Sequence, residues 1–205
     1  MPAARRTRFP LLAFAALLLA GLQLAPIRPA LACACCSERG TRVDRSVALD
    51  DPTRTQLERM TFGKEAALTT GMDDAPTGLP RGMGSELALA VTRTGDAMTF
   101  AFRAHNGMNG ALRFAMPKQM WLFTVDTYGD ARDEGLGPPL YTEWRLTADA
   151  TGDGVFSRAT AGRKATLIFH GRGRGCTEAE DFTDWSLVLH GTGATITFYG
   201  RLETP

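Results

Sequence analysis

The chain has 205 residues, 44% of them hydrophobic, with 23 basic and 22 acidic side chains. This near-neutral balance excludes nucleic acid or an anionic membrane surface as the main partner, because both require a basic footprint. The length is sufficient to bury one hydrophobic core and short enough for a single domain.

The first 32 residues have the three parts of a secretory signal peptide. A positive region holds Arg5, Arg6 and Arg8, an uncharged apolar run covers 11–24, and Ala-Leu-Ala at 30–32 provides a cleavage site. The apolar run is shorter than the about 20 residues of a membrane-spanning helix. We therefore expect a signal peptide at 1–32 and a mature protein that is periplasmic or secreted.

Cleavage before Cys33 removes four arginines and no acidic residue, which leaves 19 basic and 22 acidic side chains and a net charge of −3. The residues Ala-Leu-Ala-Cys at 30–33 also resemble a lipobox, in which the cysteine becomes lipid-modified. In that alternative the protein is a lipoprotein of the envelope. The membrane is an expected partner only if Cys33 carries lipid.

All four cysteines belong to the predicted mature chain, and three of them fall within four residues: Cys33, Cys35 and Cys36, with Cys176 far along the sequence. An exported protein meets an oxidising compartment, where disulfides persist. We expect a disulfide between Cys36 and Cys176, or alternatively between Cys176 and Cys33 or Cys35. Such a bond would tie the N-terminal segment to a distant part of the domain and stabilise it.

The same cysteine cluster also suggests a soft-metal site. Thiolates bind Cu(I) and Zn(II), and the mature chain adds seven methionines whose thioethers bind Cu(I). Two histidines each end a predicted strand just before a glycine, which would bring them to similar rims. The predicted metal ligands are Cys33, Cys35, Cys36, His170 and His190, with copper or zinc as the ion.

The segment that follows the cysteines is expected to contain the only helix. Residues 33–50 are polar and are predicted to form an extended lead-in. Asp51 followed by Pro52 is typical of a helix start, with aspartate as the N-cap and proline at the first helical position. A short helix is therefore expected over 53–60. The stretch 72–85 is rich in glycine, proline and aspartate and is predicted to be a loop.

From residue 86 onward the hydrophobic period changes to two, which is the period of a half-buried strand. A hairpin is expected over 86–102, with its turn at 94–96. Residues 33–205 are thus predicted to form one all-β domain: an antiparallel sandwich or a small closed barrel of about seven to nine strands, with a short N-terminal helix. Further strands are expected at 112–116, 121–125, 142–146, 165–170, 185–189 and 196–198.

The sequence His-Gly-Arg-Gly-Arg-Gly-Cys at 170–176 is expected to break the strand that precedes it. Alternating glycines leave backbone N–H groups available, and Arg172 and Arg174 could grip an anion between them. The alternative is a flexible turn with solvated arginines that leads to Cys176. The spacing matches neither a phosphate-binding loop nor a dinucleotide fingerprint.

No catalytic motif is apparent: the chain contains neither Gly-x-Ser-x-Gly nor His-Glu-x-x-His. No catalytic residues are predicted, and no enzymatic activity is indicated.

Several short segments together carry a resemblance. They are Ala-Cys-Ala-Cys-Cys at 32–36, Gly-Arg-Gly-Cys at 173–176, Trp-Ser-Leu at 185–187 and Phe-Tyr-Gly-Arg-Leu at 198–202. These segments resemble a group of uncharacterised exported bacterial proteins with a Cys-Ala-Cys-Cys mature N-terminus. The resemblance implies export and a shared fold, and it brings no activity with it.

The expected function is that of an exported, disulfide-stapled β-domain that binds a ligand or an envelope protein. One alternative is a periplasmic copper-binding protein that uses the N-terminal cysteine cluster. The other is a lipid-anchored envelope protein.

Overall fold

The computed structural model describes residues 36–71, 77–127, 137–174, 177–190 and 195–203. The contact pattern divides the chain into two units, 1–32 and 33–205, and every described residue belongs to the second unit. The predicted signal peptide, together with Cys33, Cys35 and Cys176, lies outside the described residues. In the described ranges, no helix has the length and apolar character that a membrane span requires.

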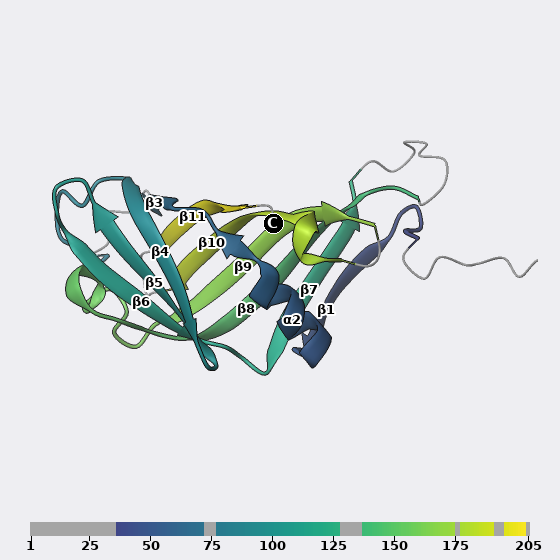
Figure 1. Ribbon diagram of the computed structural model, residues 1–205, viewed down its shortest axis with the longest axis horizontal. Coiled ribbons are helices and arrows are strands. Elements are labelled where there is room, and N and C mark those ends of the chain that lie inside the picture. Colours follow the sequence, from purple (N-terminus) through teal and green to yellow (C-terminus); the bar gives the residue numbers. More distant parts are fainter. Residues whose placement is uncertain (1–35, 72–76, 128–136, 175–176, 191–194, 204–205) are drawn as a thin grey trace, which may run out of the picture. The chain divides into compact units, whose positions relative to one another are not determined.

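Eight antiparallel strands close into a barrel (Figure 1). Each strand pairs with the next, and the last strand returns to pair with the first, so the connections run up and down around the barrel. The all-β prediction is therefore confirmed, and of its two forms the closed barrel is correct. In order around the barrel the strands are β3 (Glu65–Thr70), β4 (Glu86–Thr94), β5 (Ala97–Ala104), β6 (Asn109–Ala115), β8 (Leu140–Gly152), β9 (Lys164–Gly173), β10 (Phe182–His190) and β11 (Ile196–Glu203).

Three further strands extend this sheet. The long strand β8 pairs with β7 (Gln119–Asp126) along its first half and with β6 only at its end. Strand β1 (Arg42–Ala48) pairs with the free edge of β7, so part of the predicted lead-in is a strand. Strand β2 (Thr61–Phe62) pairs with the end of β11. The β1–β7 pair thus widens the wall beyond the closed barrel.

Helix α2 (Asp51–Arg59) begins one residue earlier than the capping pattern predicts. Asp50, rather than Asp51, is the N-cap, and its side chain accepts a hydrogen bond from the Thr53 backbone at 3.0 Å. This bond satisfies one of the N–H groups that a helix start leaves without a partner. Hydrogen bonding with the Thr53 side chain, followed by this backbone bond, lowers the pKa of Asp50. The helix buries Leu57 against the barrel core.

The barrel interior is filled by side chains. Inward positions alternate with outward ones along every strand, and the inward set is rich in phenylalanine. Phe198 stacks on Phe102 with ring centroids 4.4 Å apart, and Phe156 packs edge-on against both rings. A small barrel has an interior wide enough for side chains or for one small ligand, and here aromatic rings occupy it. A binding site must therefore be sought on the outer wall.

The glycine-arginine repeat continues a strand rather than ending it, which corrects the prediction of a break after His170. Strand β9 extends to Gly173, and its inward positions there are Gly171 and Gly173. The short helical turn η2 (Ala179–Asp181) packs directly against these two glycines, and a Cβ atom at either position would overlap Asp181. Gly171 and Gly173 therefore serve packing.

Candidate functional site

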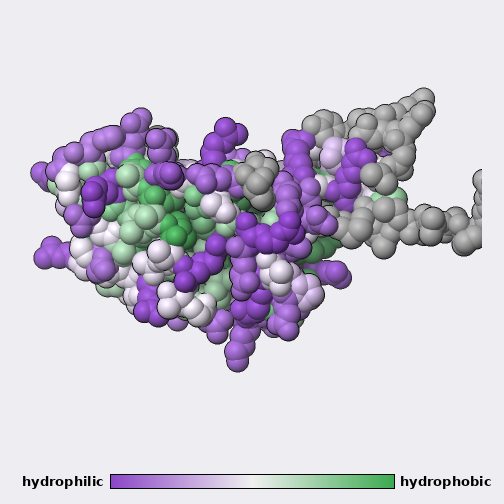
Figure 2. Space-filling model, in the orientation of Figure 1, coloured by the Kyte–Doolittle hydropathy of each residue, from purple (hydrophilic) through white to green (hydrophobic). Residues whose placement is uncertain are grey.

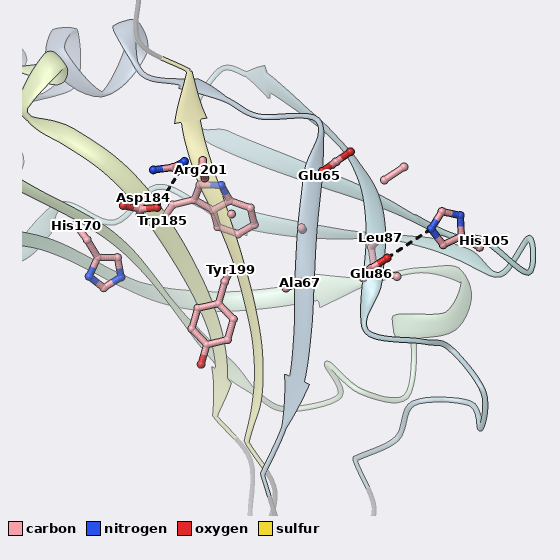
Figure 3. Close-up of a pocket in the computed structure, with 13 residues that line it drawn as sticks. Glu65, Ala67, Glu86, Leu87, His105, His170, Asp184, Trp185, Tyr199 and Arg201 are labelled. Carbon is pink, nitrogen blue, oxygen red and sulfur yellow. Dashed lines mark ion pairs between the residues drawn. The ribbon is translucent and has the colours of Figure 1, made fainter.

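A groove of about 600 Å³ crosses the outer wall over β4, β3, β11, β10 and β9 (Figure 3). It arises where two alanines lie beside larger side chains on the neighbouring strands. Ala67 lies between Tyr199 and Glu86 in the strand register, and Ala88 lies beside Glu65. Because methyl groups replace long side chains at these two positions, the wall is hollowed between the flanking strands.

A glycine of the groove lining makes room for a core side chain on the inner face of the wall. Gly200 faces Trp185 across β10 and β11, and a Cβ atom there would lie 2.6 Å from the indole Nε1 atom. The indole fills the space that a larger residue would need, and Trp185 is only 1% exposed. Its Nε1–H has no hydrogen-bond acceptor among the described residues. The groove therefore lies over a buried indole, and the methyl groups of Ala67 and Ala88 make its own floor apolar.

The two ends of the groove differ in charge. Glu65 and Glu86 stand on diagonal positions of β3 and β4, and Glu86 lies 4.0 Å from the exposed His105. At the other end Asp184 faces Arg201, and their carboxylate and guanidinium groups are 3.7 Å apart. The positive charge of Arg201 is thus offset by Asp184. The carboxylates of Glu65 and Glu86 therefore leave an excess of negative charge beside Ala67 and Ala88.

Apolar surface also continues beyond the groove. Figure 2 shows apolar residues gathered over β4 and β5, with hydrophilic residues around them. Outward-facing alanines line a shallower depression there: Ala88, Ala90, Ala101 and Ala111. Small residues on an outer wall leave backbone accessible to a ligand, and this patch is continuous with the groove at Ala88.

A chain of polar side chains forms the far edge of the groove, where His170 stands between Glu143 and Asp184 in the register. The Tyr141 hydroxyl donates to Glu143 Oε1 at 2.6 Å and lies 3.1 Å from His170 Nδ1. On the other side of the ring, His170 Nε2 lies 2.9 Å from Ser186 Oγ. Carboxylate, phenol, imidazole and hydroxyl groups from three strands are thus connected in sequence.

The hydrogen positions in this chain follow from the donors available. The Tyr141 proton is committed to the carboxylate, so the phenol oxygen accepts from His170, which places a proton on Nδ1. The neutral ring then has a lone pair on Nε2, and Ser186 donates its hydroxyl proton to it. This tautomer is the one in which an imidazole can accept a proton from serine.

Burial and hydrogen bonding set the ionisation of this chain. Burial raises the pKa of Tyr141, and its hydrogen bond to Glu143 raises it further, so the phenol stays protonated. Burial alone would also raise the pKa of Glu143. Hydrogen bonds from Tyr141 and from Arg145 Nε, the latter at 2.5 Å, outweigh that effect and hold this pKa below its ordinary value.

Sequence reasoning did not find this chain of groups. Its members come from β8, β9 and β10, and Ser186 is an ordinary strand residue with no motif around it. The only available signal was the alternation that places Ser186 on the outward face of β10, opposite Trp185 and Leu187. Which residues lie beside it depends on the register between strands, and one sequence does not specify that register.

The strand register separates the two histidines of the predicted metal site, which corrects the expectation that they share a rim. His190 faces Lys164 at one end of β9, and His170 lies six residues farther along that strand. At about 3.3 Å per residue this is a separation of about 20 Å. His190 instead lies 2.8 Å from Thr166 through its Nε2 atom. The two imidazoles cannot bind one ion.

Cys36 is the only cysteine that the described ranges include, and it is exposed just before β1. Its expected pairing with Cys176 and the cluster with Cys33 and Cys35 both involve residues outside those ranges. Among the described side chains, no group of three or more His, Cys, Asp or Glu residues could hold a metal ion. A cysteine-based copper or zinc site thus stays a prediction.

The described methionines contribute to packing. Four are buried and two are half-buried against the core, whereas Met72 lies outside the described residues. Their thioethers therefore fill the interior or pack against it. The buried ones are Met60, Met83, Met98 and Met120, and the half-buried ones are Met108 and Met116.

Arg172 and Arg174, the predicted anion-binding pair, are both exposed, with the inward glycine Gly173 between them. Arg172 lies on the outer face of β9 opposite Tyr141. Arg174 lies in the bend that follows Gly173, the last residue of the strand, so the alternation of the strand does not extend to it. Anion binding by this pair stays a prediction.

Comparison with protein-family models, with curated proteins and with solved structures finds no match to this chain. The chemistry of the groove and of the side chains around it therefore has to indicate the function.

Proposed function

We propose that the domain is an exported binding module, and that the outer groove takes a small amphipathic organic cation. The observation that carries this proposal is the groove over Ala67 and Ala88, where an apolar floor adjoins two carboxylates. The barrel interior is filled, so the groove supplies the concave surface that a ligand needs. Its volume of about 600 Å³ falls within the range of small-molecule sites.

The charge of the groove favours a cation over an anion. Among the described residues that line it there are three carboxylates and one cationic side chain, Arg201, which ion-pairs with Asp184. The carboxylates therefore outnumber the arginine by two. Exposed carboxylates attract an ammonium group only weakly, so the apolar floor has to supply a large part of the affinity. A ligand with both a positive charge and an apolar body satisfies these two requirements.

Export and a disulfide staple complete the proposal. The sequence pattern at 1–32 supports export, and the oxidising compartment that follows supports a bond between Cys36 and Cys176. Residue 36 lies shortly before β1, which is an edge strand of the sheet. A covalent tie near this edge would limit fraying of the β1–β7 extension. The proposal includes no role for nucleic acid.

Binding can be tested by titrating the mature domain with phenethylamine, and with 3-phenylpropionate as the anionic counterpart. The readout is the indole Nε1–H signal of Trp185 in a two-dimensional NMR spectrum, because this indole lies beneath Gly200. We expect a saturable shift with the amine alone. Replacing Ala88 by Trp should abolish the shift, and Glu86→Gln should weaken binding about two- to fivefold.

Two outcomes would contradict the proposal. One is a shift that the carboxylate produces as strongly as the amine, since the charge argument would then be wrong. The other is binding that survives in the Ala88→Trp variant, because that side chain fills the floor of the groove. The signals of Trp121 and Trp144 serve as internal controls, since neither residue lines the groove.

A further inference from the structure

Three neighbouring strands bring together a hydroxyl, an imidazole and a carboxylate at the edge of the groove. Ser186 Oγ lies 2.9 Å from His170 Nε2, and the opposite ring nitrogen lies 3.5 Å from Glu143 Oε1. The Tyr141 hydroxyl bridges the ring and the carboxylate. A nucleophile within hydrogen-bond reach of a base, which a third group orients, is the arrangement of covalent acyl-transfer sites.

We infer that Ser186 and His170, held in place by Tyr141 and Glu143, form a nucleophilic acyl-transfer site for an ester of the cation that the groove takes. This inference rests on the proposed function for the identity of its substrate, but its chemistry can be tested separately. It assigns Ser186 as the nucleophile and His170 as the general base. Tyr141 and Glu143 are positioning residues, because they act on His170 and not on the substrate.

The reaction proceeds with balanced atoms and charges. Ser186 Oγ attacks the ester carbonyl carbon, the new C–O bond forms, and the hydroxyl proton passes to His170 Nε2. The imidazolium then returns that proton to the departing alcohol oxygen as the original C–O bond breaks. A water molecule then attacks the acyl carbon while His170 takes its proton. The imidazolium returns this proton to Ser186 Oγ as the acyl C–O bond breaks, which releases the carboxylic acid and restores Ser186 and the neutral His170.

Side chains supply the donors for the developing oxyanion. The backbone N–H groups of β9, β10 and β11 belong to the sheet ladder, so they do not form an oxyanion hole here. Tyr199 faces Ser186 directly across the strands, and Arg201 lies on the adjacent diagonal. Figure 3 shows Tyr199, Arg201 and His170 on the same side of the groove. A phenol and a guanidinium thus occupy the strand positions next to Ser186.

The accessibility of the nucleophile limits the substrate. Ser186 is 3% exposed, between Ile168 and Tyr199 in the register, so only a small acyl group can approach it. The carboxylates that would hold the cation begin two to three strands away, at β3 and β4. With about 4.8 Å between neighbouring strands, the ammonium and the carbonyl of the substrate should be about 10 to 14 Å apart.

The same sheet contains an internal control. His190 Nε2 lies 2.8 Å from the hydroxyl of Thr166, which matches the hydrogen-bond length of the Ser186 pair. Within the described residues, no carboxylate forms a hydrogen bond or ion pair with His190. The two pairs therefore differ in the positioning carboxylate, and also in that threonine is branched. Comparing them separates an ordinary hydroxyl–imidazole contact from an activated one.

The experiment treats the folded mature domain with an alkyl fluorophosphonate and follows its intact mass. An activated serine forms an O–P bond while the P–F bond breaks; fluoride leaves, and His170 takes the proton. We expect one adduct per chain, mapped to Ser186 by fragmentation. Ser186→Ala should abolish labelling, His170→Gln should slow it about 100-fold, and His190→Gln should leave its rate unchanged.

Three results would overturn the inference. They are an unlabelled wild-type domain, an adduct that persists in Ser186→Ala, and equal slowing by His170→Gln and His190→Gln. Ser186→Cys provides a second variant that keeps a small polar side chain at this buried position. It should lose the fluorophosphonate adduct and gain a rapid reaction with iodoacetamide, which His170→Gln should slow.

The positioning residues need a readout other than stability. Glu143→Gln and Tyr141→Phe should each slow labelling about tenfold and raise the population of the Nε2–H tautomer of His170 in its ¹⁵N spectrum. Glu143→Asp should restore part of both effects. An unchanged tautomer in these variants would contradict the positioning role, even if both variants were less stable.

A final comparison separates this inference from the proposed function. Ser186→Ala should still bind phenethylamine, because the residue lies outside the floor of the groove. Acetate esters of trimethylammonio alcohols are then compared, with the ammonium and carbonyl about 10 Å or about 4 Å apart. We expect faster turnover of the longer ester. Labelling without cation binding would retain the nucleophile but refute the proposed ligand class and the ester that depends on it.

Discussion

The two faces of the barrel wall use the same strands for different purposes. On β10 the inward residues Trp185, Leu187 and Leu189 are fully buried in a continuous core. The outward residues of that strand alternate with them and include Asp184 and Ser186, which belong to the groove edge and its polar chain. A shift of one residue in pairing would exchange the two sets.

This difference separates the residues that determine stability from those that form the candidate site. Inward positions are selected by volume, because a close-packed interior has no space for larger groups and loses contacts when groups are removed. Outward positions tolerate small or polar residues, so they can assemble a hollow and a hydrogen-bonded chain at little cost in stability. Substitutions on the inner face should therefore change unfolding most, and those on the outer face should change it least.

The largest effect is expected from Phe198→Ala on the inner face. Phe198 is fully buried and contacts the rings of Phe102 and Phe156. Removing the ring leaves a cavity among aromatic groups, so we expect the free energy of unfolding to fall by about 3–5 kcal/mol in urea denaturation. A loss below about 1 kcal/mol would show that the interior is not packed as described.

The second effect is expected from Gly200→Ala, at the point where the two faces meet. The added methyl group would lie 2.6 Å from Trp185 Nε1, so the indole must move. We expect a loss of about 1–3 kcal/mol by the same measurement. In a Trp185→Phe background the smaller ring leaves space, and there the same substitution should cost clearly less. An equal loss of unfolding free energy in both backgrounds would show that the cost comes from the backbone at Gly200 and not from overlap with the indole.

The third effect is expected from Arg93→Ala, at the end of strand β4. Its guanidinium donates to the backbone carbonyls of Leu57 at 3.0 Å and Met60 at 2.6 Å, at the carboxyl end of α2. We expect a loss of about 2 kcal/mol, because these carbonyls lose charged donors. The control is Asp96→Ala, which removes the ion pair with Arg54 and leaves the hydrogen bond from Arg54 Nε to the Leu49 carbonyl in place; this exposed pair should contribute less than about 1 kcal/mol.

The smallest effect is expected from Glu143→Gln on the outer face, and it should depend on pH. The folded state lowers the pKa of Glu143, so the fold favours its carboxylate form. The resulting stability, about 1 kcal/mol, is fully present above the ordinary value of 4.5 and is lost as the pH falls through the lowered pKa. Below the lowered pKa, the wild type should thus be no more stable than the Glu143→Gln variant.

Urea denaturation at pH 7 and at pH 3 provides the measurement for Glu143, and Thr166→Ala is the control on the same face. Thr166 forms side-chain hydrogen bonds with His190 and Thr147 but, among the described residues, with no carboxylate, so its effect should stay within about 0.5 kcal/mol at either pH. An advantage of the wild type that grows toward acid would contradict the direction of the Glu143 shift.

Local patterns in the sequence predicted most of the strands. The hairpin of β4 and β5 and the strands β6, β8, β10 and β11 coincide with stretches of alternating residues, whereas β7 coincides with a short apolar run and β9 with the strand expected at 165–170. Strands β1, β2 and β3 were missed. The first two carry few apolar residues, and Glu65–Thr70 has two buried positions, Ala66 and Leu68, among short or polar neighbours. A weak alternation of this kind becomes a strand because its neighbours pair with it.

The candidate site was largely beyond sequence reasoning, and the reason is geometric. His170 and His190 looked equivalent because each ends a predicted strand before a glycine. Antiparallel pairing of β9 with β10 places them about 20 Å apart. The same pairing places Ser186 beside His170, although neither has a catalytic motif around it.

The sequence by itself determined the all-β class, the inward-facing core of most strands and the short helix, because these depend on the spacing of residues close together in the chain. Only the tertiary structure decided that the sheet closes, that the Gly-Arg repeat is a strand, and that two alanines hollow the outer wall. Those features depend on strand register, and register is set by the packing of residues far apart in the sequence.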